Sequence, residues 1–174
     1  MKSIFKSRIR KGIATRPIEN MASALRSASI EQLGNELKTV IEKKFARSFH
    51  IREVDTGSCG ACESEIISAT NPVYDIQRFG VDVVASPRHA DALLVTGPVS
   101  KNMELALRRT FEAMPSPKLV ITFGDCALNG GIFKDAYYAC GGAGKVLPVH
   151  AHIPGCPPSP VDLLQAILDL LKKR

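Results

Sequence analysis

The stretch Asp55-Thr-Gly-Ser-Cys59-Gly-Ala-Cys62-Glu-Ser-Glu65 governs the interpretation of this chain. It places two cysteines, with two residues between them, in a turn that joins a predicted strand to a predicted helix. Small residues beside and between the cysteines let the backbone wrap closely around a bound group and point its N–H groups inward. A C-x-x-C pair serves as a redox dithiol, as half of a zinc site or as part of an iron–sulfur site. The pair must therefore be completed from elsewhere in the chain.

Length and composition indicate one domain with a hydrophobic core. The chain has 174 residues, and 45% of them are hydrophobic, which suits a single domain. No apolar run reaches the roughly 18 to 20 residues that cross a bilayer, and the amino terminus lacks the apolar region of a secretory signal. The five cysteines are an odd number without an export signal, which favours a reducing compartment. We therefore expect a soluble or peripheral protein whose cysteines serve metal or redox chemistry.

The excess positive charge lies at the amino terminus. The net charge of +6 equals the charge of the six basic residues that precede Glu19, the first acidic residue: Lys2, Lys6, Arg8, Arg10, Lys11 and Arg16. The rest of the chain is neutral overall and lacks the basic footprint of a nucleic-acid binder, so no nucleic-acid partner is predicted. We interpret residues 1–28 as a basic arm. A solvated tail is the simplest form of this arm, and the alternatives are a segment that orders on a membrane or partner and an organelle-targeting presequence.

The hydrophobic pattern predicts alternating strands and helices. Short apolar runs predict strands over residues 49–55, 81–85, 92–96, 119–123 and 146–149, the last extending towards Ile153. Helical spacing predicts helices over residues 30–45, 63–70, 101–114 and from Pro160 onward, the first opened by a Ser29–Gln32 capping box and the last capped by Ser159. We therefore predict a three-layer α/β domain with a mostly parallel sheet over residues 49–174, preceded by the arm (1–28) and a helical segment (29–48).

Four of the five cysteines directly follow predicted strands. Cys59 and Cys62 follow the first strand, Cys126 the fourth and Cys156 the last. The carboxyl ends of parallel strands gather at one edge of the sheet, where open sheets bind ligands. Four thiolates from three loops hold either zinc or a [4Fe-4S] cluster. One close pair joined by two distant cysteines in Gly- and Pro-rich loops favours the cluster over zinc, with a redox dithiol as the third possibility. Cys140 is predicted to be an unligated thiol.

Five segments carry the motifs of one family: Gly57-Ser-Cys-Gly-Ala-Cys-Glu-Ser-Glu-Ile66, Arg78-Phe-Gly80, Ser86-Pro-Arg-His-Ala-Asp91, the Gly124-Asp-Cys126 loop with Gly130-Gly131, and Ile153-Pro-Gly-Cys-Pro-Pro158. Together they resemble the small, cluster-bearing subunit of membrane-bound [NiFe] hydrogenases, including formate hydrogenlyase-type enzymes. The same superfamily contains the 20 kDa subunit of respiratory complex I. The resemblance extends over about residues 50–165, with the motifs in order and consistently spaced.

The resemblance implies a flavodoxin-like fold and one [4Fe-4S] cluster bound by Cys59, Cys62, Cys126 and Cys156. In hydrogenase relatives this cluster lies next to a nickel–iron site held by the large subunit. The chain has no second C-x-x-C pair, so it is expected to transfer electrons within an oxidoreductase complex and not to be catalytic alone. The implied partners are a hydrogenase large subunit or a complex I 49 kDa-like subunit, a ferredoxin-like iron–sulfur subunit and membrane subunits. The implied location is peripheral, at the cytoplasmic face of the cell membrane.

The spacing of Cys59 and Cys62 favours the hydrogenase relatives, because complex I relatives carry adjacent cysteines at this position. A complex I-like subunit that passes electrons to quinone or to a sulfur substrate is the alternative. Gly60-Ala61 stands where close hydrogenase relatives are expected to have Asn-Gly, which weakens assignment to any one subgroup. Outside this superfamily, the competing classes are a phosphate-binding flavodoxin-like module and a zinc-stabilised assembly protein.

Three titratable residues near the motifs have two interpretations each. Glu63 and Glu65 are expected to be ordinary partners of a helix N-terminus, with proton transfer beside the cluster as the alternative. His89 is expected to belong to a hydrogen-bonded loop, with tuning of a nearby cofactor or interface as the alternative.

Overall fold

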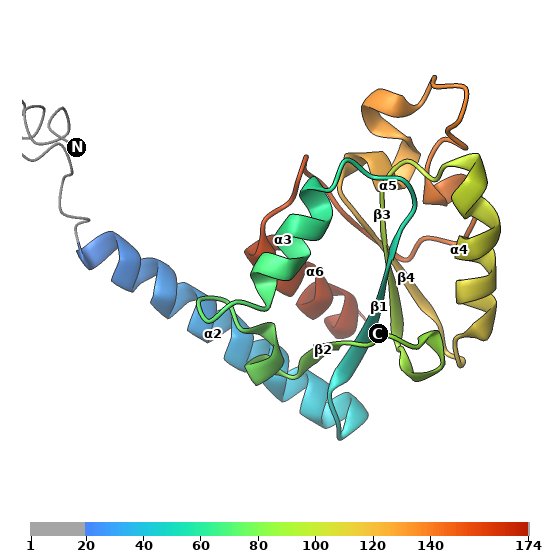
Figure 1. Cartoon of the computed structure of the whole chain (residues 1–174). Helices are drawn as coiled ribbons and strands as arrows, with labels where there is room; N and C mark the ends of the chain where they lie inside the picture. The colour runs from blue at the N-terminus through green and yellow to red at the C-terminus, as the bar shows by residue number, and fades with distance from the viewer. Residues whose placement is uncertain (1–19, 174) are drawn as a thin grey trace, which may run out of the picture. The chain divides into compact units, whose positions relative to one another are not determined.

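A parallel sheet of five strands forms the core of the protein. The computed structural model describes residues 20–173, with side chains from residue 29 onward. The strands follow the order β2-β1-β3-β4-β5, and every neighbouring pair is parallel (Figure 1). Their bounds are β1 (Phe49–Asp55), β2 (Val81–Val83), β3 (Ala92–Thr96), β4 (Leu119–Phe123) and β5 (Ala151–Ile153). This is the flavodoxin-like strand order, which confirms the predicted fold class.

Helices cover both faces of the sheet, as the three-layer prediction requires. On one face α3 (Ala61–Ala69) contacts α6 (Pro160–Lys172), and α4 (Lys101–Ala113) covers the opposite face (Figure 1). The short helix α5 (Asp125–Asn129) follows β4 directly. Four short 3₁₀ segments complete the connections: η1 (Ile76–Phe79), η2 (Pro87–His89), η3 (Gly131–Phe133) and η4 (Ala143–Lys145). None of the helices within the described residues is long and apolar enough to span a membrane.

Each face of the sheet buries its own set of apolar side chains. On the α4 face, Leu107 packs into a cluster that includes Val54, Leu93, Val95 and Val120. Successive residues of a strand point to opposite faces, so β3, which is buried at every position, contributes to both layers. This arrangement fixes the strands in place and leaves their carboxyl ends to support a site.

Helix α2 (Asn20–Phe45) begins earlier than predicted. The capping box at Ser29 was wrong, because the helix continues through that residue. Residues 20–28 contain several good helix formers, which explains the extension. Residues 1–19, which hold the basic positions of the predicted arm, lie outside the described residues. The chain divides into two compact units, Met1–Glu31 and Gln32–Arg174, and the predicted boundaries at residues 28 and 48 stay predictions.

The predicted strand over residues 146–149 was also wrong. The structure has the 3₁₀ segment η4 and a turn before that region, and β5 begins only at Ala151. Pro148 has no N–H with which to join a ladder. The ring of His150 accepts the N–H of Val120 at 3.0 Å, and the backbone N–H of His150 donates to the carbonyl oxygen of Val120 at 2.9 Å, so backbone pairing with β4 begins only at His150. The other strand and helix predictions agree with the structure to within two residues at each end.

Ser159 is the N-cap of α6, as predicted, and removing its hydroxyl should lower the stability of the protein measurably. Its hydroxyl accepts the N–H of Asp162, whose carboxylate accepts the N–H of Ser159 at 2.8 Å. Because the Ser159→Ala variant leaves a helix N–H without its partner, we expect the free energy of unfolding to fall by about 1 kcal/mol. Chemical denaturation measures this change.

Ser100 provides a matched control for Ser159. It is the N-cap of α4, which also has 13 residues, but its side chain makes no capping hydrogen bond. Ser100→Ala should therefore change the free energy of unfolding by less than about 0.5 kcal/mol. Equal losses in the two variants would show that the capping box does not stabilise α6.

Candidate metal centre

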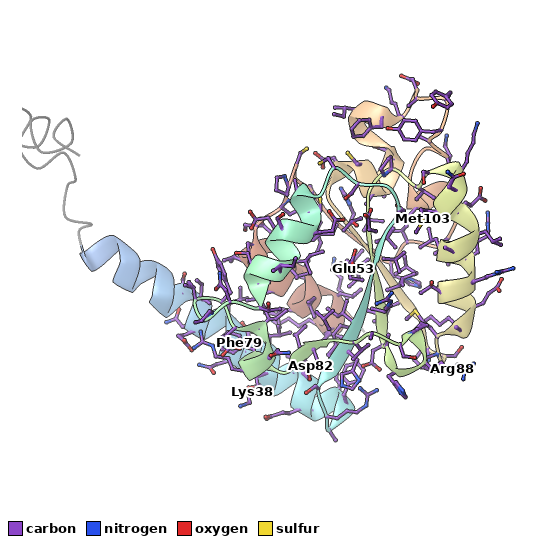
Figure 2. All side chains as sticks on the ribbon, viewed as in Figure 1. Lys38, Glu53, Phe79, Asp82, Arg88 and Met103 are labelled. Carbon is purple, nitrogen blue, oxygen red and sulfur yellow. The ribbon has the colours of Figure 1, made fainter. Side chains whose placement is uncertain are left out.

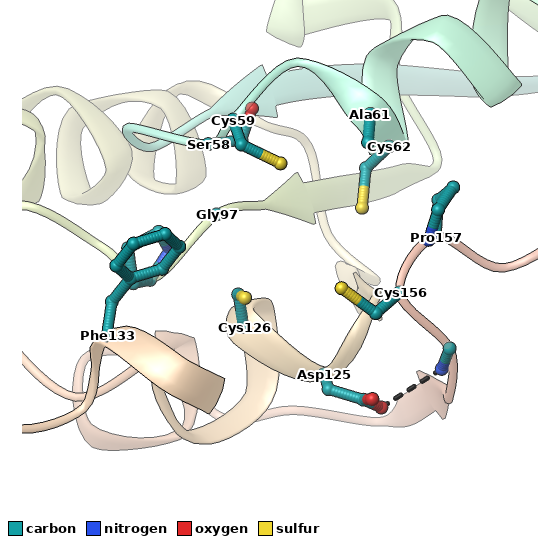
Figure 3. A pocket seen from close by; sticks show the side chains of 12 residues that line it. Ser58, Cys59, Ala61, Cys62, Gly97, Asp125, Cys126, Phe133, Cys156 and Pro157 are labelled. Atoms are coloured by element: carbon teal, nitrogen blue, oxygen red, sulfur yellow. Dashed lines mark hydrogen bonds between the residues drawn. The ribbon is translucent and has the colours of Figure 1, made fainter.

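The four strand-end cysteines line one hollow at the carboxyl edge of the sheet. Cys59 and Cys62 lie in the turn after β1 and in the first turn of α3, Cys126 lies in α5 directly after β4, and Cys156 lies in the loop after β5. Figure 3 shows the four sulfur atoms directed into the same space. The topology thus brings together thiols that are up to 97 positions apart in the sequence. Their role as ligands stays a prediction.

The hollow itself is small, with a volume of about 20 Å³, and it opens to solvent. Besides the cysteines, its lining is Ser58, Ala61, Gly97, Pro98, Asp125, Phe133, Gly155 and Pro157. Sequence reasoning missed Gly97, Pro98 and Phe133 as part of this site. Gly97 and Pro98 follow β3 directly, so the strand-end rule that located the cysteines could have found them. No sequence signal pointed to Phe133. Among the described residues, no three His, Cys, Asp or Glu side chains form a group that could hold a metal ion.

The C-x-x-C turn is held in shape by its own hydrogen bonds. The Asp55 carboxylate accepts the N–H groups of Gly57 at 2.8 Å and Ser58 at 2.7 Å. The Ser58 hydroxyl accepts the N–H of Gly60 at 2.9 Å and donates to Glu63 at 2.6 Å. Both ends of the turn are therefore fastened to nearby side chains, which places its two thiols without the help of a ligand.

Two glycines allow the strand-end loops around the hollow to approach the C-x-x-C turn and its thiol. Gly97 has a φ of +78°, and a Cβ there would lie 2.6 Å from the backbone nitrogen of Ser58. Gly124 has a φ of +89°, and a Cβ there would lie 2.7 Å from the sulfur of Cys62. Any side chain at these positions would occupy the space that the turn or its thiol now fills.

Two thiols of the hollow, those of Cys62 and Cys126, are not stabilised as thiolates by the protein alone. Burial raises the pKa of Cys62 to about 12, and the nearby charges of Glu63 and the other three cysteines contribute to the increase. Burial and then the charge of Cys156 raise the pKa of Cys126. A metal centre that binds thiolates reverses this tendency, because its positive charge deprotonates coordinating thiols. The donor set and its mutual repulsion therefore fit a cationic iron–sulfur centre.

Cys140 lies outside the hollow. Its thiol donates to the Glu104 carboxylate over 3.5 Å, and the side chain packs against the hydrophobic cluster under α4. The structure therefore places Cys140 apart from the other four cysteines, where the sequence predicted an unligated thiol.

The acidic residues of α3 lie close to the hollow. Glu63 is in the first turn of α3, where its negative charge interacts favourably with the positive end of the helix dipole. One of its oxygens accepts the Ser58 hydroxyl, and the other is buried with no hydrogen-bond partner among the described residues. Glu65 is half-buried in the same helix. The proton-transfer alternative for both residues is untested.

His89 lies far from the cysteines. It ends η2, shortly before β3 begins, and its carbonyl oxygen lies 3.0 Å from the ring of His50. Figure 2 labels its neighbour Arg88, which lies at the end of the sheet opposite the hollow. The His89 loop is thus hydrogen-bonded, as expected, and it is not placed to tune a group in the hollow.

Comparison with known proteins identifies the family. The model of the NADH ubiquinone oxidoreductase 20 Kd subunit family matches residues 59–170. This range contains all four cysteines of the hollow and most of the sheet. The chain belongs to this family, and the resemblance seen in the sequence motifs is confirmed.

Several named relatives are subunits of oxidoreductase complexes. Formate hydrogenlyase subunit 7 of Escherichia coli is 45% identical over 128 residues, which are 74% of this chain and 50% of that protein. The chain thus spans about half the length of that relative. The probable membrane-bound hydrogenase subunit mbhJ of Pyrococcus furiosus is 41% identical over 131 residues, 75% of this chain and 78% of that protein.

Solved structures agree with the fold. A chain of the membrane-bound sulfane sulfur reductase, an archaeal respiratory membrane complex, matches with a TM-score of 0.64 and 35% identity, over 72% of this chain and 70% of that chain. A chain of an NAD⁺-reducing [NiFe]-hydrogenase matches with a TM-score of 0.56 at 18% identity, over 74% of this chain and 93% of that chain, which bears on the fold alone.

Proposed function

We propose that this protein is an electron-transfer subunit of a membrane-associated [NiFe] hydrogenase complex. In this proposal Cys59, Cys62, Cys126 and Cys156 bind one [4Fe-4S] cluster, which lies next to the nickel–iron site of a large subunit. The observation that carries the proposal is the convergence of these four thiols, from three strand-end loops, on one hollow. A bound cluster of this kind takes up and releases single electrons. The protein's own contribution is to hold the thiolates, set their surroundings and limit access of water.

The hollow suits a cluster better than a zinc ion. Structural zinc sites usually take their four ligands as two close pairs, whereas here one close pair, Cys59 and Cys62, is joined by two single cysteines from other loops. Gly97 and Gly124 leave the hollow free of side chains at the two closest approaches. Phe133 and Pro98 add apolar walls, which lower the local dielectric and so influence the reduction potential of a bound group.

Exposed apolar side chains beside the hollow support docking of a larger subunit. Ile132 and Tyr137 are 83% and 88% exposed, and both flank the segment that contains the lining residue Phe133. Large apolar side chains gathered at one place on a surface mark interaction sites. A partner that covers this segment would also cover the mouth of the hollow and bring its own redox site close to the cysteines. The other proposed partners are a ferredoxin-like iron–sulfur subunit and membrane subunits, and through them the chain would be peripheral at the cytoplasmic face.

A second function has support from one solved structure. The sulfane sulfur reductase chain shares 35% identity and a TM-score of 0.64 with this protein. A complex I-like subunit that passes electrons to quinone or to a sulfur substrate is therefore the alternative. The two-residue spacing between Cys59 and Cys62 argues against the complex I relatives, whereas sulfur-reducing relatives share it, and the hydrogenase-named relatives favour the hydrogenase function.

Metal content and hydrogen oxidation of the intact complex separate the two functions. A hydrogenase complex should contain nickel and should reduce a dye in the presence of hydrogen. This activity should disappear when the large subunit is removed, because this chain carries only the proposed cluster ligands. A nickel-free complex that reduces quinone or polysulfide would disprove the hydrogenase function while leaving the cluster ligands unchanged.

A further inference from the structure

Asp125 joins the two loops that carry single cysteines. It precedes Cys126 at the end of β4, and its carboxylate accepts the N–H of Gly155 at 3.0 Å (Figure 3). Its own N–H donates to the carbonyl oxygen of Gly155 at 2.9 Å. Gly155 immediately precedes Cys156. One residue thus makes two hydrogen bonds across the hollow's lower wall, and each end of this link is next to a proposed cluster ligand.

The carboxylate of Asp125 is also placed from a second side. The imidazole Nε2 of His152, in β5, lies 3.9 Å from the same carboxylate oxygen. The other ring nitrogen of His152 lies 3.0 Å from the hydroxyl of Thr122, which is fully buried in β4. The buried strand therefore fixes the ring beside the carboxylate, while the Gly155 N–H is the group that hydrogen-bonds to it.

We propose that Asp125 is a positioning residue that holds Cys126 and Cys156 at their separation and places a negative charge beside the cluster. The inference rests on the proposed function, because it assumes that these cysteines bind a [4Fe-4S] cluster. Hydrogen bonds and charge near a cluster set its reduction potential. A carboxylate there disfavours the added electron of the reduced state. Asp125 would therefore affect both how firmly the cluster is held and the potential at which it works.

Two variants of the purified complex separate the hydrogen bonds from the charge. Asp125→Asn keeps an oxygen that accepts the Gly155 N–H but removes the charge. We expect it to retain its iron and to shift the cluster's midpoint potential to a more positive value. Asp125→Ala removes both the charge and the acceptor, so we expect it to lose most of its iron and sulfide. Asp82→Asn, in β2 at the opposite end of the sheet (Figure 2), should match the parent in both measurements.

A third measurement, made on the iron-depleted form of each variant, does not depend on the cluster. Hydrogen exchange at the Gly155 amide should be faster in Asp125→Ala than in Asp125→Asn, because only the latter retains an acceptor. If the parent complex showed no [4Fe-4S] signal, the proposed function would fail, and the exchange rates would still test the link. Full iron content and an unchanged potential in Asp125→Ala would overturn the inference, as would a potential shift of Asp125→Asn to more negative values.

Discussion

Replacing Cys126 with Ser should remove the [4Fe-4S] cluster, whereas replacing Cys140 with Ser should leave it in place. The Cys126 thiol lines the hollow with the other three proposed ligands, and a hydroxyl is a much poorer ligand for iron than a thiolate. The Cys140 thiol lies elsewhere, bonded to Glu104 over 3.5 Å. Its hydroxyl replacement can make the same bond, so the free energy of unfolding should change by about 1 kcal/mol or less. Iron, acid-labile sulfide and the visible absorbance of the purified complex measure the outcome.

The same substitution at Cys59, Cys62 and Cys156 completes the test. Each of these variants should fall to the low iron content of the Cys126 variant, because all four thiols share one site. Cys140→Ser serves as the matched control, since it removes the same sulfur atom from the same domain. Loss of the cluster in Cys140→Ser together with its retention in Cys126→Ser would show that the ligand set is wrong. Zinc in place of iron in the parent protein, lost in the four ligand variants and kept in Cys140→Ser, would favour a structural zinc site.

The parts of the site that follow from strand topology could be predicted from the sequence. Cys126 comes directly after the apolar run 119–123, Cys59 and Cys156 each follow a segment with strand character, and the carboxyl ends of parallel strands meet at one edge. Apolar strands of this kind are readable because burial on both faces leaves no polar alternation. The position of the hollow therefore required no knowledge of side-chain geometry, only the order of the strands and the residues that follow them.

The parts that depend on tertiary contacts could not be predicted in this way. Ser29 has the local pattern of an N-cap, but the preceding residues continue the helix. The strand predicted at residues 146–149 failed because Pro148 lacks an N–H and the His150 ring takes up a backbone bond, which only the folded neighbour Val120 reveals. Asp125 lies in the Gly124-Asp-Cys126 motif, but the sequence indicated no role for its side chain. Its contact with Gly155 spans 30 positions of sequence and depends on both loops being in place.

Gly97→Ala should cause a large loss of stability and should also disturb the cysteine turn. At the present φ of +78°, an alanine costs about 1–2 kcal/mol in backbone strain. The new Cβ would also lie 2.6 Å from the Ser58 nitrogen and 3.0 Å from the Gly57 carbonyl carbon, and these backbone atoms cannot rotate away. The turn must therefore move and carry Cys59 away from the hollow. We expect a fall of about 3 kcal/mol or more in the free energy of unfolding, together with loss of iron.

Gly80→Ala is the control, because it has a similar φ of +85° while its nearest neighbour, a methyl group of Ile41, is at 3.6 Å. That variant should lose only the strain energy, about 1–2 kcal/mol, and keep its iron. Denaturation curves and iron analysis measure both variants, and equal losses of stability with full iron in each would show that close packing of Gly97 against the cysteine turn does not hold the site together.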